Sequence, residues 1–162
     1  MKDRCAYLLV VLVLALSLFA CSEETSVAKD PYDEAADAAA DVEAALQAAE
    51  AEGKLVLLNF GANWCPDCRA LSRAMEDPEL AAIIDHRFVM AKIDVGNWDK
   101  HPGVVDDWDN PIGEGIPAIV VARPDGEILF ATRRGQISTA RDMGQEQFAE
   151  FFRLLAELGQ GA

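Results

Sequence analysis

Two cysteines with two residues between them, Cys65 and Cys68, are the side chains of this chain with the clearest chemistry. They follow a short apolar run, residues 55–60, which lies between glycines and predicts a buried strand. Residues 69–75 are good helix formers, and Pro66 suits the first turn of a helix because its missing N–H costs nothing there. Cys65 is therefore expected at a strand-to-helix junction, at or beside the helix N-terminus.

The N-terminus of a helix is a favourable place for a thiolate. Its free backbone N–H groups and the helix dipole favour a negative charge, and the thiolate is the nucleophile of disulfide exchange. Cys68 lies about one turn further on, so it can form a disulfide with Cys65 or resolve a mixed one. Asp67 opposes a second negative charge between the sulfurs, whereas Arg69 would stabilise the thiolate if it turned towards it. The pair is predicted to carry out thiol–disulfide exchange.

The stretch from Trp64 to Cys68, WCPDC, resembles the active site of the thioredoxin family, and the resemblance covers roughly residues 33–158. It implies that Cys65 attacks a substrate disulfide and that Cys68 resolves the mixed disulfide, with no cofactor beyond the redox-active Cys65–Cys68 disulfide. By the same resemblance, Trp64 flanks the active site and Pro117 is a cis-proline facing the cysteines. The backbone of Ile116 would then pair with an extended substrate segment.

The sequence also departs from the thioredoxin pattern. Thioredoxins carry a buried acid six residues ahead of the first cysteine, and here that position is Asn59, which cannot take a proton. Resolution by the second cysteine would then need water or another base. Lys92 stands where thioredoxins carry a lysine beside that acid, but here it has no acid at position 59 to pair with. Pro66-Asp67 replaces the Gly-Pro of ordinary thioredoxins, so a general cytosolic-type thioredoxin is not expected. The predicted site comprises the catalytic Cys65 and Cys68 and the supporting residues Trp64, Pro66, Asp67, Asn59, Ile116 and Pro117.

The rest of the chain predicts the elements that would position this site. Amphipathic or apolar periodicity, helix caps and turn residues set their limits. The expected elements are a helix over 33–52, the strand over 55–60, a helix after the cysteines, a helix from Pro78 with Asp77 as N-cap, a strand over 88–95, a short helix over 104–108, strands over 116–122 and 127–133 joined by a turn, a polar connection over 136–144 and a helix over 145–158. This order, a βαβ unit followed by a β-hairpin, predicts an α/β thioredoxin-like fold with a central mixed sheet flanked by helices.

The segment 96–115 is less regular and contains Trp98, His101, Trp108 and several aspartates. We expect a surface helix whose tryptophans pack on the domain. The alternative of a metal site from His101 and the aspartates is less favoured, because one histidine with scattered acids lacks a known ligand spacing. A lid or a substrate contact beside the cysteines is a third possibility, since long loops in compact domains are often functional.

Residues 1–20 are predicted to be a signal peptide: a positively charged start is followed by an apolar run too short for a membrane span of about 20 residues. The run ends in Leu-Phe-Ala-Cys, which resembles a bacterial lipobox and makes Cys21 the expected lipidation site. Ser22 after it resembles sorting to the outer rather than the inner membrane. Residues 21–32 are expected to be a flexible tether, and 33–160 the thioredoxin-like domain. An ordinary signal peptide with an incidental cysteine is the alternative.

The net charge of the chain excludes some classes of binding partner. The 162 residues carry a formal net charge of −14, which argues against nucleic acid or an anionic membrane surface as an electrostatic partner. The leading hypothesis is a lipid-anchored thiol–disulfide oxidoreductase of the periplasmic face, acting on protein thiols and disulfides. It would lean towards a reductant, with a membrane electron donor because nothing resembles a nicotinamide or flavin site. The alternatives are a Cu(I) or other soft-metal carrier using the two cysteines, and a non-catalytic thioredoxin-like binding module.

Overall fold

The computed structural model describes residues 30–160. The elements are α2 (Ala38–Glu52), β1 (Leu55–Gly61), α3 (Pro66–Ala74), α4 (Pro78–Arg87), β2 (Phe88–Asp94), α5 (Pro102–Asp107), β3 (Ala118–Ala122), β4 (Ile128–Ala131), the short 3-10 helix η1 (Ala140–Asp142) and α6 (Gln145–Ala156). The sheet order is β2-β1-β3-β4, with β1 parallel to β2 and antiparallel to β3, and β3 antiparallel to β4. This mixed sheet with a βαβ unit and a hairpin confirms the predicted thioredoxin-like fold.

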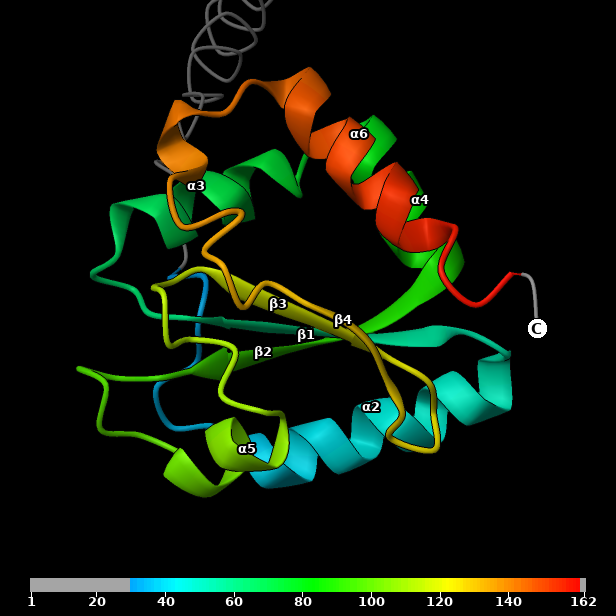
Figure 1. Cartoon of the computed structure of the whole chain (residues 1–162), viewed down its shortest axis with the longest axis horizontal. Helices are drawn as coiled ribbons and strands as arrows, with labels where there is room; N and C mark the ends of the chain where they lie inside the picture. The colour runs from blue at the N-terminus through cyan, green and yellow to red at the C-terminus, as the bar shows by residue number, and fades with distance from the viewer. Residues whose placement is uncertain (1–29, 161–162) are drawn as a thin grey trace, which may run out of the picture.

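Helices cover both faces of the sheet. Helices α2 and α5 lie on one face, and α3, α4 and α6 lie on the other (Figure 1). Strand β1 is central and every residue in it is buried, so its side chains supply both layers of the core. Val56, Leu58 and Phe60 belong to the cluster shared with α2, whereas Leu55 and Leu57 pack with residues of α3, α4 and α6. The carboxyl end of β1 leads directly into the two cysteines.

Two helix starts follow from their caps. Helix α2 begins at Ala38 and not at residue 33, because the Asp37 carboxylate accepts hydrogen bonds from the N–H groups of Ala39 and Ala40. Residues 33–36 form a turn instead. Helix α4 has the predicted Asp77 cap, which accepts from the Glu79 and Leu80 N–H groups.

Other boundaries differ in ways that affect the site. Strand β3 begins at Ala118, so Ile116 and Pro117 form the approach to the strand and not its first residues. The connection 136–144 is not simply polar, because Ile137 is fully buried and η1 packs beside α3. Tyr32, assigned above to the tether, is 2% exposed and belongs to the core.

The predicted signal peptide and the Cys21 lipidation site lie outside the described residues. No helix within residues 30–160 is long and apolar enough to cross a bilayer.

Candidate active site

Cys65 is the N-cap of α3, as the sequence predicted. Its sulfur accepts a hydrogen bond from the N–H of Cys68 at 3.2 Å, and Pro66 occupies the first turn, where no N–H is needed. Both cysteines are free thiols and both are buried, Cys65 at 3% exposure and Cys68 at 0%. The strand β1, the cap geometry and the proline together fix the two sulfurs at the helix N-terminus.

The two thiols have very different acidities. The pKa of Cys65 is lowered to about 7, first because the Cys68 thiol donates a hydrogen bond to its sulfur and further because the N–H groups of Cys68 and Asp67 point at it; burial and the Asp67 charge oppose this. The pKa of Cys68 is raised far above its usual range, because Cys68 is the donor in that thiol pair and because it is buried. Above about pH 7, Cys65 therefore holds the negative charge and Cys68 holds the proton.

The segment before β3 closes over Cys65. The Ile116–Pro117 peptide bond is cis, the isomer that the family resemblance implied. The Cys65 sulfur lies 3.6 Å from the Ile116 carbonyl oxygen, to which the protonated thiol donates. The structure thus brings together Cys65, Cys68, Ile116 and Pro117, which are up to 52 positions apart in the chain.

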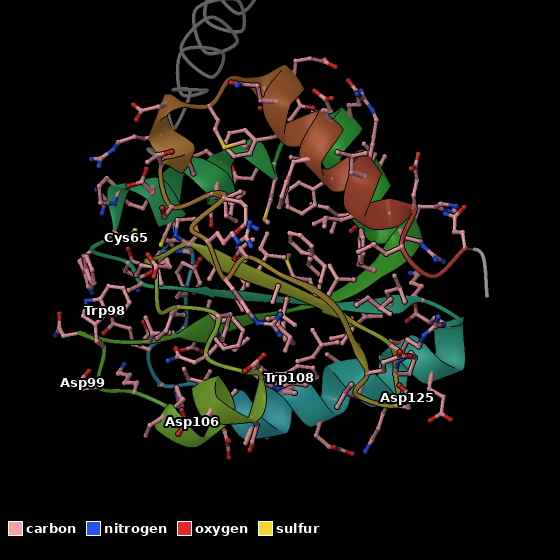
Figure 2. The ribbon with its side chains drawn as sticks, viewed as in Figure 1. Cys65, Trp98, Asp99, Asp106, Trp108 and Asp125 are labelled. Atoms are coloured by element: carbon pink, nitrogen blue, oxygen red, sulfur yellow. The ribbon has the colours of Figure 1, made fainter. Side chains whose placement is uncertain are left out.

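Two tryptophans form an exposed aromatic pair beside the cysteines. Trp64 is 48% exposed and Trp98 is 52% exposed, and their ring centroids are 6.2 Å apart. The Trp64 indole N–H donates to the Gly96 carbonyl at 2.7 Å, which joins the cysteine loop to the 96–100 turn. Figure 2 shows Cys65 and Trp98 at the same end of the molecule. The expectation that both tryptophans of segment 96–115 pack on the domain was wrong for Trp98, and holds only for Trp108 at 7% exposure.

The charged residues of the motif have partners away from the Cys65 sulfur. Asp67 is buried and accepts from the Arg141 backbone N–H at 2.9 Å, and its other oxygen lies 3.4 Å from the Arg141 guanidinium. Arg69 donates instead to the Asn63 carbonyl at 2.6 Å, so it braces the loop. The predicted opposition of Asp67 to the thiolate is present, because its charge raises the pKa of Cys65.

A buried cluster behind the cysteines includes Tyr32, a residue that the sequence did not predict to be part of the site. Asn59 is fully buried, and its amide oxygen accepts a hydrogen bond from the Tyr32 hydroxyl at 3.1 Å. The Tyr32 backbone exchanges two hydrogen bonds with the Asn63 side chain, at 3.0 and 2.9 Å. A large aromatic residue within an otherwise polar stretch was the available signal. Lys92 lies opposite Asn59 in the register of β1 and β2.

The candidate metal ligands do not come together. Within residues 30–160, no three His, Cys, Asp or Glu side chains form a group suited to a metal ion. His101 is the residue before α5, and a copper ion held by the cysteine pair would find no third ligand of these types in that part of the chain.

Residues 37–124, more than half of the chain, match the profile of the thioredoxin-like family, and the chain belongs to that family. A thioredoxin of Buchnera aphidicola is 31% identical over 85 residues, covering 52% of this chain and 69% of its own length. The crystal structure of a disulphide isomerase from Xylella fastidiosa superposes with a TM-score of 0.77 and 42% identity, covering 78% of this chain and 97% of that one. The crystal structure of the C-terminal domain of DsbD from Neisseria meningitidis, in its oxidised form, superposes with a TM-score of 0.51 and 26% identity. The match covers 74% of this chain and 96% of that one.

The family, these relatives and the paired cysteines define the class of protein. The chain is a thioredoxin-like thiol–disulfide oxidoreductase. Protein thiols and disulfides are the class of substrate that the family suggests.

Proposed function

We propose that the protein reduces protein disulfides, with Cys65 as the nucleophile and Cys68 as the resolving thiol. The observation that carries this proposal is the difference between the two thiols: the pKa of Cys65 is about 7 and that of Cys68 is strongly raised. Only the first is a thiolate near neutral pH, so it attacks, and the second retains its proton until the mixed disulfide has formed. Cys68 then attacks the Cys65 sulfur, the substrate thiolate leaves, and Cys65–Cys68 is oxidised.

The direction of electron flow is tested by the reduction potential. Equilibration of the purified protein with dithiothreitol and glutathione buffers should give a value nearer to about −270 mV, at the reducing end of the family, than to about −120 mV. A value near the second figure would assign the protein as a disulfide donor. A pair that forms no intramolecular disulfide would rule out both directions and favour Cu(I) carriage.

Isomerisation of non-native disulfides is a second candidate, because the relative with 42% identity is described as a disulphide isomerase. It uses the same Cys65 thiolate but returns the electrons to the substrate. Recovery of active ribonuclease from its scrambled form, without net consumption of reductant, would favour the isomerase. Turnover that consumes stoichiometric reductant with insulin favours the reductase.

We place the protein in the cell envelope, anchored by lipid on Cys21 at the periplasmic face, with the outer membrane favoured and a membrane donor recycling the oxidised pair. The lipobox-like Leu-Phe-Ala-Cys at residues 18–21 and Ser22 support this placement. Membrane fractionation tests it, because Cys21→Ala should move the protein out of the membrane fraction. Retention of that variant would remove the lipid anchor from the proposal.

The exposed aromatic pair supports a macromolecular substrate. Removing one ring by Trp98→Ala should raise KM for insulin about threefold to tenfold, since burying an aromatic side chain contributes about 1 kcal/mol or more. The rate with a small disulfide such as oxidised glutathione should stay within about twofold, because the cysteines are untouched. Leu154→Ala is the matched control, since Leu154 is 58% exposed but lies on α6. An equal loss with both substrates would contradict a docking role for Trp98.

A further inference from the structure

The Tyr32 hydroxyl lies inside the protein beside the resolving cysteine. A Cβ atom built on Gly61 would stand 2.2 Å from the Tyr32 hydroxyl oxygen and 2.9 Å from the Cys68 sulfur. The absence of a side chain at Gly61 therefore gives the hydroxyl and the thiol a shared space. Tyr32 itself is 2% exposed and Cys68 fully buried, so the hydroxyl stands where bulk water does not.

Three further contacts hold the hydroxyl in that position. It donates to the Asn59 amide oxygen at 3.1 Å. The two hydrogen bonds between the Tyr32 backbone and the Asn63 side chain attach this segment to the loop that carries the cysteines. The Asn59 amide nitrogen has no hydrogen-bond partner among the described residues, although it is buried. A buried donor without a partner costs free energy, so the Asn59 side chain is held at this position at a cost in stability.

The Tyr32 hydroxyl keeps its proton and is available as a donor. Burial and the two cysteines raise the pKa of Tyr32 well above its usual value, so the phenol keeps its proton when the cysteines react. The Cys68 sulfur, once it loses its proton, is an acceptor in a buried place, and hydrogen bonding from Tyr32 lowers the pKa of Cys68. A charge-assisted hydrogen bond of this kind is stronger than the neutral one to Asn59.

We propose that Tyr32 is a catalytic residue in the second half of the reaction: its hydroxyl turns from the Asn59 amide to the Cys68 sulfur and stabilises the Cys68 thiolate. Asn59 holds the hydroxyl until then, at the position where thioredoxins carry an acid. The arrangement would serve the resolving step without a buried carboxylate. This inference rests on the proposed roles of Cys65 and Cys68.

The step balances without an outside oxidant. The Cys68 thiol loses one proton, the Cys68 sulfur bonds to the Cys65 sulfur, and the bond between Cys65 and the substrate sulfur breaks. The substrate leaves as a thiolate and takes up one proton. In the reverse step an external thiolate attacks Cys65, Cys68 leaves as the thiolate, and the same hydroxyl stabilises it.

Four titratable groups surround this chemistry. Cys65 and Tyr32 interact with the Cys68 thiol directly. Asp67 lies on the same helix and is held by Arg141, and Lys92 lies opposite Asn59 in the sheet. A change confined to the Tyr32 hydroxyl leaves the other three in place.

The test is a two-phase reaction with dithionitrobenzoate in the full chain carrying Cys5→Ser and Cys21→Ser. Attack by Cys65 releases one thionitrobenzoate, and resolution by Cys68 releases a second. Tyr32→Phe keeps the ring and removes the hydroxyl, so the first phase should stay within about twofold. The second should slow by about tenfold or more, the effect of losing a hydrogen bond to a charged group, with its pH midpoint raised by about one unit.

Ser72→Ala is the matched control, because it removes another buried hydroxyl from the helix that carries Cys68, one without a partner among the described residues. Neither phase should change in that variant. If Tyr32→Phe does not fold, replacing both tyrosines of the chain by fluorotyrosine should instead accelerate the second phase, since a more acidic phenol is a better donor.

The outcomes separate this inference from the proposed function. An unchanged second phase, or an equal slowing of both phases, in Tyr32→Phe would overturn the role of Tyr32. Failure of the wild-type protein to reduce insulin, with a second phase that still depends on Tyr32, would instead overturn the proposed reductase and leave the inference standing.

Discussion

Replacement of Cys65 by serine should abolish reduction of insulin disulfides, with a loss of at least about a thousandfold, as for the removal of other enzymic nucleophiles. A serine hydroxyl stays protonated near neutral pH, so the N-terminus of α3 would have no nucleophilic anion to stabilise. The rate is measured by insulin precipitation with dithiothreitol as the electron source, in the Cys5→Ser/Cys21→Ser background.

Replacement of Cys68 by serine should have a different result. Cys65 still attacks, but nothing releases the mixed disulfide, so a covalent adduct with the substrate should accumulate and be visible by mass spectrometry under non-reducing conditions. An adduct that forms in Cys65→Ser and not in Cys68→Ser would reverse the two roles.

The alternative functions give other patterns. A Cu(I) carrier would lose metal binding in both variants and show no turnover as wild type. A binding module would bind its partner unchanged in both variants. Loss of turnover in one variant and a trapped adduct in the other is expected only of a catalytic pair.

The sequence was enough to predict the order of the elements and the position of Cys65. Both depend on local signals: an apolar run for β1, Pro66 in the first turn of α3, and Asp77 with Pro78 at α4. The cis isomer at Pro117 was predicted from the resemblance to thioredoxins, because local sequence patterns do not encode it.

The remaining features of the site are made by contacts between distant residues. Tyr32 reaches Asn59 across 27 positions, and Arg141 reaches Asp67 across 74, so no pattern within one element predicts either contact. Trp98 is 52% exposed on the 96–100 turn and has a φ of 69°, a backbone conformation that bulky side chains seldom adopt. Tertiary contacts maintain such a conformation, and the hydrogen bond from the Trp64 indole to the Gly96 carbonyl is one that holds this turn.

The reduction potential should fall with rising pH along two slopes. Below about pH 7 both thiols of the reduced protein are protonated, so each molecule takes up two electrons and two protons and the potential falls by about 59 mV per pH unit. Above the pKa of Cys65, which is about 7, reduction takes up one proton, because Cys65 stays a thiolate and Cys68 keeps its proton. The slope should then be about 30 mV per unit.

The break between the slopes is measured by equilibrating the purified protein with dithiothreitol buffers from about pH 5 to about pH 9. Asp67→Asn removes a charge that raises the pKa of Cys65, so the break should move to lower pH in that variant. A steep slope that continues to the top of the range would mean that Cys65 is protonated there, and a slope near zero would mean that Cys68 is ionised as well. Either result would contradict the division of charge and proton between the two cysteines.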